Sequence, residues 1–255
     1  MKYKAIILDV DGTLVTYDYN ALPSEKVHKI INRAREHVVV CIATGRSFAF
    51  VEPILQALDL NYGLAIVNNG AQVLDIQTKQ SYYSKPLNSE DVETVISTLL
   101  DEDISFFMNC GGDDFLYQRG PLPSSIFNIY SRELFSQNKI RRVIKKLSMH
   151  PKISILETSH CNPGVSGFVI THALATKQQG IWEAAKVLDL KPAEIVGVGD
   201  GYNDFPLLMA CGLKIAMGNA NDDLKGIADY IAPSVENDGV AHVIEKYILA
   251  SIDEV

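Results

Sequence analysis

Strands and helices that alternate along both ends of this chain predict an α/β protein with a mostly parallel sheet. Short apolar runs of strand length recur in both parts, and stretches with helical spacing of apolar residues separate them. The middle of the chain interrupts this alternation. We therefore expect a parallel-sheet domain formed by residues 1–82 and 174–255, covered by helices on both faces, with a second α/β domain inserted at residues 83–173.

The first part of the chain supplies three expected strands and two expected helices. Ser24 can cap a helix, because its hydroxyl can accept a hydrogen bond from a backbone N–H of the first turn. Apolar residues then follow at the i, i+3, i+4 and i+7 positions of one helix face. The expected strands are residues 3–8, 38–43 and 64–67, and the expected helices follow Ser24 and Ser47.

The last third of the chain repeats the same alternation. The inserted stretch between the two parts has two helical patterns, several short strands, and loops rich in Gly, Pro and Asp, which is why we expect a separate domain there. The expected order of the last third is a helix over 176–188, a strand over 195–198, a turn over 199–204, a helix through Cys211, and strands over 213–217 and 230–232.

Composition narrows the class of protein. The formal charge of −8 argues against a general nucleic-acid binder, since affinity for the phosphate backbone comes from clustered Lys and Arg. No apolar run approaches the roughly 20 residues that span a bilayer, and acidic residues interrupt the N-terminus too early for a signal peptide. We expect no membrane association, a cytoplasmic location, and free thiols at Cys41, Cys110, Cys161 and Cys211.

Two aspartates directly after the first expected strand form the most informative motif, Asp9-Val10-Asp11-Gly12-Thr13. Ligands of open α/β sheets bind beyond the carboxyl ends of the strands, where both carboxylates belong. One carboxylate could attack phosphorus while the other exchanges protons. The alternative is a pair of acids that simply ends the strand in a turn. A calcium-binding EF-hand loop is excluded, because it needs its glycine at the sixth position and Gly12 stands at the fourth.

A second acidic cluster, residues 199–204, follows another apolar strand. Asp200 and Asp204 are four residues apart and would face the same way if a helix begins there. Several carboxylates at one point repel each other without a cation. Mg²⁺ resolves this conflict, because it binds oxygen ligands and bridges to phosphate. The alternative is a helix cap with an incidental aspartate.

Three further residues could hold a phosphate in this acidic protein. Thr44 and Gly45 follow an expected strand and offer a hydroxyl and accessible backbone N–H groups, although an ordinary strand-to-helix connection would look the same. Lys177 lies in the first turn of a helix capped by Thr176, where a cation opposes the helix dipole unless an anion is present. The alternative for Lys177 is a solvated side chain that is tolerated at small cost.

These four segments, in this order, resemble the signature of the haloacid dehalogenase-like hydrolase superfamily. Residues 9–13 match its first motif, Thr44 the second, Lys177 the third, and residues 200–204 the fourth. The Cof-type branch, which carries a C2 cap, is similar at residues 69–71, 216–220 and 228–230. The resemblance implies a Rossmann-like core and an inserted cap domain that governs substrate specificity.

The resemblance also implies roles for the acidic residues. Asp9 would be the nucleophile that forms an aspartyl-phosphate, and Asp11 would protonate the leaving alcohol and then activate water. Mg²⁺ would be held by the Asp9 side chain, the Asp11 carbonyl and Asp200, with Asp204 as a ligand or as support for the ligands. We expect Mg²⁺ as the cofactor on this basis.

The same resemblance assigns the phosphoryl oxygens to four polar groups. They would be held by Thr44, the Gly45 amide, Lys177 and Asn203. Phosphoryl transfer depends mainly on positioning and charge neutralisation, which one Mg²⁺ and one lysine can supply in an acidic protein.

Three hypotheses on function follow, and hydrolysis of a small phosphorylated metabolite leads. A phosphotransferase or mutase could use the same intermediate, but a mutase normally needs a second phosphate site. A non-catalytic metabolite sensor would be expected to lack Asp9 or Asp11. The sequence does not indicate the oligomeric state. Phosphorylated sugars are the expected substrate class, by family analogy alone.

Overall fold

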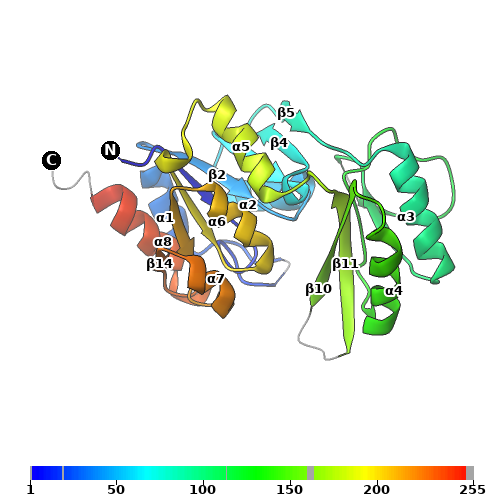
Figure 1. Cartoon of the computed structure of the whole chain (residues 1–255). Coiled ribbons are helices and arrows are strands. Elements are labelled where there is room, and N and C mark those ends of the chain that lie inside the picture. The colour runs from blue at the N-terminus through cyan, green and yellow to red at the C-terminus, as the bar shows by residue number, and fades with distance from the viewer. Residues whose placement is uncertain (1, 19, 113, 160–163, 251–255) are drawn as a thin grey trace. The chain divides into compact units, whose positions relative to one another are not determined.

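The computed structural model describes residues 2–18, 20–112, 114–159 and 164–250. The chain divides into two compact units. The first unit combines Met1–Tyr83 with Thr176–Val255, and the second unit is Ser84–Ala175. Figure 1 shows that the first unit is assembled from both ends of the chain, and each unit has a hydrophobic core of its own.

The first unit is built around an eight-stranded sheet, in the order β14-β13-β12-β1-β2-β3-β4-β5. The strands from β14 to β3 run parallel to one another, and β4 joins β3 in the antiparallel direction. The expected α/β class with a mostly parallel sheet is therefore confirmed. The strands are β1 (Ala5–Leu8), β2 (Val39–Ala43), β3 (Leu64–Val67), β4 (Gln72–Asp75), β5 (Ser81–Ser84), β12 (Ile195–Gly199), β13 (Leu213–Ala216) and β14 (Tyr230–Ile231).

Helices cover both faces of this sheet, as Figure 1 shows. Because the central strands are buried on both faces, their sequences are nearly continuous apolar runs. One face packs against α1 (Glu25–Ala34), α2 (Phe48–Ala57) and α8 (Gly239–Ile244), and the other face packs against α5 (Lys177–Val187), α6 (Phe205–Ala210) and α7 (Asp222–Ile227).

Two helices begin at the caps that the sequence predicts. The Ser24 hydroxyl accepts a hydrogen bond from the Val27 N–H at 3.1 Å and starts α1. The Thr176 hydroxyl accepts one from the Gln179 N–H at 3.1 Å and starts α5. Each cap satisfies a backbone donor that has no partner within its helix, so the start of α5, and with it Lys177, is defined locally.

The second unit is an antiparallel sheet in the order β10-β11-β8-β6-β7, with β9 paired to β11. Met108, Ile129 and Ile170 lie in register across three neighbouring strands and join one core with α3 (Ser89–Asp101) and α4 (Gln137–Leu147). The strands are β6 (Phe107–Asn109), β7 (Asp114–Leu116), β8 (Asn128–Tyr130), β9 (Phe135–Ser136), β10 (Ile153–Ser159) and β11 (Val165–His172).

Two further expectations concern thiols and membranes. Cys41, Cys110 and Cys211 are free thiols as expected, and Cys41 is fully buried in β2. Cys161 lies outside the described residues. Among the helices of the described residues, none combines the length and the apolar character required to cross a membrane.

Candidate active site

The carboxyl ends of three neighbouring parallel strands meet at one edge of the large sheet. Asp9 directly follows β1, Thr44 follows β2, and Asp200 follows β12. β1 pairs with both β2 and β12, so these three residues leave the sheet side by side. This is the position at which open α/β sheets bind ligands.

Three buried carboxylates surround one buried ammonium group at this edge. Carboxylate oxygens of Asp9, Asp200 and Asp204 all lie within 4.8 Å of one another. The Lys177 Nζ donates to Asp9 Oδ1 at 2.5 Å and to Asp204 Oδ1 at 2.6 Å. The side chain of Lys177 is only 1% exposed, so these two contacts replace its hydration. The alternative interpretation, in which Lys177 is a solvated surface residue, is therefore wrong.

Asp204 reaches the cluster by a route that the sequence does not predict. The sequence predicts a turn over residues 199–204, and α6 begins only at Phe205, so Asp200 and Asp204 do not share one face of a helix. Residues Tyr202–Asp204 form a 3₁₀ turn, and Asp204 Oδ2 accepts hydrogen bonds from the backbone N–H groups of Asp200 and Gly201, both at 2.9 Å. The tight turn brings the two acids together because the aspartate side chain folds back onto the backbone of its own turn.

The electrostatics of the cluster favour a cation. Burial raises the pKa of Asp9 well above its ordinary value, and the neighbouring Asp204 raises it further. Burial also raises the pKa of Asp200 to about 6, although hydrogen bonds from Tyr17 and Thr13 oppose this. Burial by itself would lower the pKa of Lys177, but the two carboxylates in contact with it raise that pKa. Three acids facing one ammonium group leave excess negative charge, and their oxygens are the donors that Mg²⁺ prefers.

Asp11 is not one of the three clustered acids, and it makes a contact with Arg46 that sequence reasoning missed. The guanidinium of Arg46 donates from Nε to Asp11 Oδ2 at 3.0 Å and from Nη2 to Asp11 Oδ1 at 2.5 Å. The structure therefore separates the two acids of the first motif: Asp9 contacts Lys177, whereas Asp11 contacts Arg46. Such a two-pronged contact fixes the orientation of a carboxylate as well as its position.

The turn after β2, which carries Thr44 and Gly45, is held by internal hydrogen bonds. Thr44 is fully buried, its hydroxyl accepts a hydrogen bond from the Arg46 N–H at 3.1 Å, and its carbonyl accepts one from the Asn69 N–H at 3.0 Å. A Cβ added at Gly45 would lie 3.1 Å from Asn69 Oδ1. Glycine at position 45 thus keeps this turn close to the turn after β3.

Gly70 sets the approach of α5 to the site. Its backbone has φ +94°, a left-handed conformation that favours glycine, and an added Cβ would lie 2.0 Å from the Thr176 carbonyl oxygen. Only glycine lets the turn Asn68–Gly70 pack directly against the cap of α5. This close approach places Lys177, the first residue of α5, over the strand ends.

Further polar contacts converge on Asp200. The Thr13 hydroxyl donates to Oδ1 at 3.2 Å, the Tyr17 hydroxyl donates to Oδ2, and the Asn219 amide donates to Oδ2 at 3.3 Å. Asn219 also donates to the Gly12 carbonyl at 2.8 Å, so it joins the first acidic motif to the fourth. No local sequence signal marks Tyr17, which is 183 residues from its partner.

Asn203 lies in the 3₁₀ turn beside this cluster and is partly exposed. Its Oδ1 faces the backbone of Gly201, where an added Cβ would lie only 2.6 Å away. The structure therefore brings Asp9, Asp200, Asp204 and Lys177 into contact and places Thr44, Gly45 and Asn203 in the turns around them.

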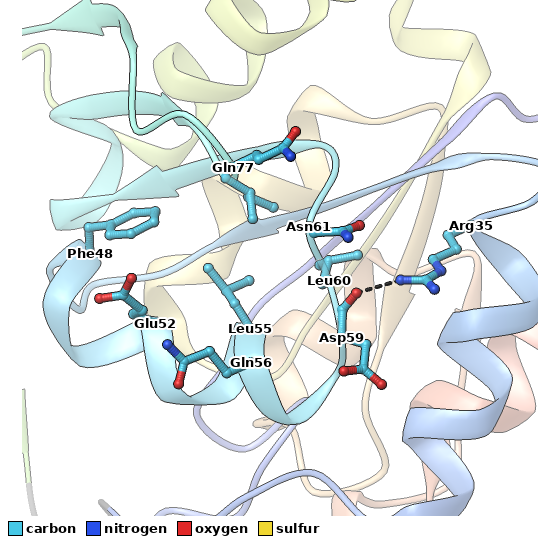
Figure 2. Close-up of a pocket in the computed structure, with 10 residues that line it drawn as sticks. Arg35, Phe48, Glu52, Leu55, Gln56, Asp59, Leu60, Asn61 and Gln77 are labelled. Atoms are coloured by element: carbon cyan, nitrogen blue, oxygen red, sulfur yellow. Dashed lines mark hydrogen bonds between the residues drawn. The ribbon is translucent and has the colours of Figure 1, made fainter.

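A separate groove of about 520 Å³ lies on the same unit, and none of the clustered acids lines it. Figure 2 shows its lining, in which the Arg35 guanidinium donates to the carbonyl oxygen of Asp59. Arg35 precedes β2 and Asp59 precedes β3, so the groove lies at the amino ends of the strands. The candidate site occupies the carboxyl ends.

Aspartates at neighbouring strand ends, with a buried lysine in contact with two carboxylates, form the arrangement that the four sequence motifs imply for a hydrolase. The chain belongs to the haloacid dehalogenase-like hydrolase family, whose model matches residues 6–163 and 124–244. A relative from Bacillus subtilis, named 5-amino-6-(5-phospho-D-ribitylamino)uracil phosphatase, is 26% identical over 251 residues, covering 96% of each chain.

Solved structures show the same fold. A haloacid dehalogenase-like hydrolase from Bacteroides thetaiotaomicron superposes with a TM-score of 0.83 at 22% identity, covering 96% of this chain and 99% of that one. A sugar phosphatase of HAD subclass IIB superposes with a TM-score of 0.78 at 21% identity, covering 96% and 98%. At these identities the likeness is one of fold.

Proposed function

We propose that this protein is a Mg²⁺-dependent phosphatase that hydrolyses small phosphorylated metabolites through an aspartyl-phosphate on Asp9. The observation that carries the proposal is the buried cluster at the strand ends: Asp9 contacts Lys177 at 2.5 Å and lies within 4.8 Å of the oxygens of Asp200 and Asp204. Family membership supports the same chemistry.

The donors present fit Mg²⁺. The carboxylates of Asp9, Asp200 and Asp204 would hold it, together with the backbone carbonyl of Asp11, and Asp204 could serve as a direct ligand or as support for Asp200. When bound, the ion would neutralise charge on the phosphoryl oxygens. Asp200 is fixed for this role by Thr13, which donates to the carboxylate oxygen Oδ1.

Asp9 and Asp11 divide the reaction between them. In the first step a carboxylate oxygen of Asp9 bonds to phosphorus, the bond from phosphorus to the leaving oxygen breaks, and Asp11 gives its proton to that oxygen. In the second step water attacks the same phosphorus and Asp11 takes the proton. The bond to Asp9 then breaks and inorganic phosphate leaves.

Lys177 and the neighbouring turns hold the phosphoryl group in place. The ammonium group of Lys177 lowers the pKa of Asp9, against the burial that raises it, and would offset negative charge as phosphorus is attacked. Thr44, the Gly45 N–H and Asn203 would donate to the phosphoryl oxygens. Support for this assignment comes from the turns that carry these donors, which follow β2 and β12, the two strands that pair with β1.

Sugar phosphates and related polyol phosphates are the substrate class that we propose. Support comes from the B. subtilis relative, whose name contains a phosphorylated ribityl group, and from the structural neighbour described as a sugar phosphatase. Residues 83–173 would form the cap that selects the leaving group. The free thiols of Cys41, Cys110 and Cys211 suit a reducing cytoplasm.

The test is a Mg²⁺-supplemented screen of the purified protein against a panel of phosphorylated sugars, polyols, nucleotides and amino acids, with release of inorganic phosphate as the readout. Asp9→Asn is the matched control, because it removes the attacking charge at nearly constant volume. We expect turnover by the wild-type protein and none by the variant, with intact-mass detection of a phosphate on Asp9. Turnover by folded Asp9→Asn would contradict the proposal, and transfer of phosphate to an added alcohol instead of water would favour a phosphotransferase.

A further inference from the structure

The contact between Arg46 and Asp11 has no role in the function proposed so far. Arg46 meets both carboxylate oxygens of Asp11, at 3.0 Å and 2.5 Å. It lies in the turn between β2 and α2, two residues after Thr44. Asp11 lies two residues after Asp9 in the loop that follows β1. The contact therefore joins two turns that both border the site.

Within this pair, Arg46 is the anchored partner. Its backbone N–H donates to the Thr44 hydroxyl at 3.1 Å, and its carbonyl accepts from the Asn68 N–H at 2.9 Å. Its guanidinium also donates to the Phe50 carbonyl at 3.4 Å. The Arg46 side chain is 9% exposed, whereas that of Asp11 is 38% exposed. The backbone of Arg46 is thus held on both sides, and its buried guanidinium sets where the more exposed carboxylate of Asp11 points.

We propose that Arg46 is a positioning residue that orients Asp11 for proton exchange. This inference rests on the proposed function, in which Asp11 first donates and then accepts a proton. A two-pronged contact fixes the torsion of the carboxylate, and each oxygen keeps a second lone pair on the side away from the guanidinium. Proton exchange at that side remains open while the orientation is held.

The proton balance of the reaction gives the contact a second purpose. When Asp11 gives its proton to the leaving oxygen, it becomes an anion, and the guanidinium beside it already matches that anion in charge and shape. When water attacks the aspartyl-phosphate, Asp11 takes a proton from that water and the pair returns to its starting charge. Lysine would keep the charge but lose the planar fork that holds both oxygens.

The experiment is a comparison of Arg46→Gln, Arg46→Lys, Asp11→Asn and the double variant Arg46→Gln/Asp11→Asn. The first chemical step is measured with enzyme in excess, using p-nitrophenyl phosphate and the best alkyl phosphate from the screen. An alkoxide needs a proton as it leaves, whereas p-nitrophenolate does not. We expect Arg46→Gln to slow the alkyl reaction roughly 10- to 100-fold and the aryl reaction less than about 3-fold.

Non-additivity identifies the path through Asp11. Once Asp11→Asn has removed the proton-exchanging group, loss of Arg46 should add less than about 3-fold on either substrate. Arg46→Lys should behave like Arg46→Gln, because charge alone does not fix orientation. Arg35→Gln is the matched control: Arg35 also anchors a neighbouring loop, at the groove of Figure 2, and its loss should leave both rates unchanged.

Two results would overturn the inference. If Arg46→Gln slows both substrates equally and the loss multiplies with that of Asp11→Asn, Arg46 acts on the phosphoryl group or on the fold instead of on Asp11. Thermal unfolding of each variant separates these two possibilities. If Asp11→Asn itself shows no difference between alkyl and aryl substrates, the proton-exchange role of Asp11 fails, and the inference fails with it. Phosphorylation of Asp9 would still stand in that case.

Discussion

Lys177 brings an ammonium group into the most buried part of the site, where burial alone would favour the neutral amine. Its charge is retained because Asp9 and Asp204 are within 2.6 Å of it. The positive charge of Lys177 also offsets part of the repulsion among the three neighbouring carboxylates. Lys177 therefore supports the folded state as well as the proposed chemistry.

Replacing this lysine should destabilise the folded protein. We predict that Lys177→Met lowers the free energy of unfolding by roughly 3 to 5 kcal/mol in EDTA, because it leaves buried carboxylates without their partner. Urea unfolding measures the loss. Lys186→Met is the control, since Lys186 pairs with Glu183 on the surface of the same helix at 2.9 Å and should contribute less than about 1 kcal/mol. Similar losses for the two variants would show that the buried contacts do not stabilise the fold.

Asp200 should make stability depend on pH in the metal-free protein. Its pKa is about 6 when folded and near 4 when unfolded, so the folded protein binds more protons between these values. The free energy of unfolding should thus fall as pH rises from 4 to 6, by roughly 2 to 3 kcal/mol from this group, and the raised pKa of Asp9 acts in the same direction. Urea unfolding in EDTA across this range should show a clearly reduced slope for Asp200→Asn. An unchanged slope would exclude Asp200 as the source.

Residues that end strands or cap helices could be placed from the sequence alone. Asp9, Asp200 and Lys177 each follow such a signal, and the structure brings them together. Arg46 and Tyr17 could not be placed, because their partners lie 35 and 183 residues away and depend on how turns meet in three dimensions. Asp11 was assigned a role without its partner for the same reason.

At the scale of elements, long patterns were predicted more reliably than short ones. The expected strand over residues 64–67 coincides with β3, and the expected helix over 176–188 exceeds α5 by one residue at each end. The helix α7 was not predicted, because six residues are too few to show a periodic pattern, and α8, which continues into a helical stretch at Glu245–Leu249, was not predicted either. The turn expected over residues 199–204 is present, and backbone N–H groups that donate to the Asp204 carboxylate favour a 3₁₀ turn at its end.

The packing of α5 can be tested through two helical glycines. A Cβ at Gly180 would lie 2.5 Å from Ile66 and 3.1 Å from Gly70, whereas none of the described atoms lies within 4 Å of a Cβ at Gly226 in α7. Gly180→Ala should therefore lower the free energy of unfolding by roughly 1 to 3 kcal/mol and reduce turnover by displacing Lys177. Gly226→Ala should raise it by roughly 0.5 to 1 kcal/mol, because alanine favours helix. Chemical unfolding and phosphatase rates distinguish the two, and a stable, fully active Gly180→Ala would contradict the tight packing.

At the scale of the whole molecule, the net charge is negative, and the positive charge at the candidate site comes from individual residues. The chain carries a formal charge of −8, and three of its carboxylates are buried at the candidate site beside one lysine. A long-range field of this sign does not attract phosphates, so binding of an anionic substrate requires positive charge supplied at the site itself. The fold provides this charge through Lys177, because the start of α5 lies beside the ends of the strands.

Mg²⁺ binding should consequently stabilise the first unit. Trp182, the single tryptophan of the sequence, lies in α5 five residues after Lys177, so its fluorescence reports on this unit. We predict that the unfolding temperature followed by Trp182 rises with Mg²⁺, with a gain in free energy of roughly 2.7 kcal/mol when the ion is at 100 times its Kd. Ca²⁺ should act more weakly on turnover, because its looser coordination misplaces phosphate.

Two variants make the metal prediction specific to the acidic cluster. Asp200→Asn should lose most of the Mg²⁺-induced shift, because it removes one of the buried carboxylate ligands. Glu25→Gln should keep the full shift, since Glu25 is an exposed acid in α1 that pairs with Lys29. An equal shift in both variants would mean that Mg²⁺ acts on the general acidity of the surface, and the assignment of the ion to Asp9, Asp200 and Asp204 would then be wrong. Retention of the wild-type shift by Glu25→Gln alone ties stabilisation by the ion to the same carboxylates that the proposed chemistry uses.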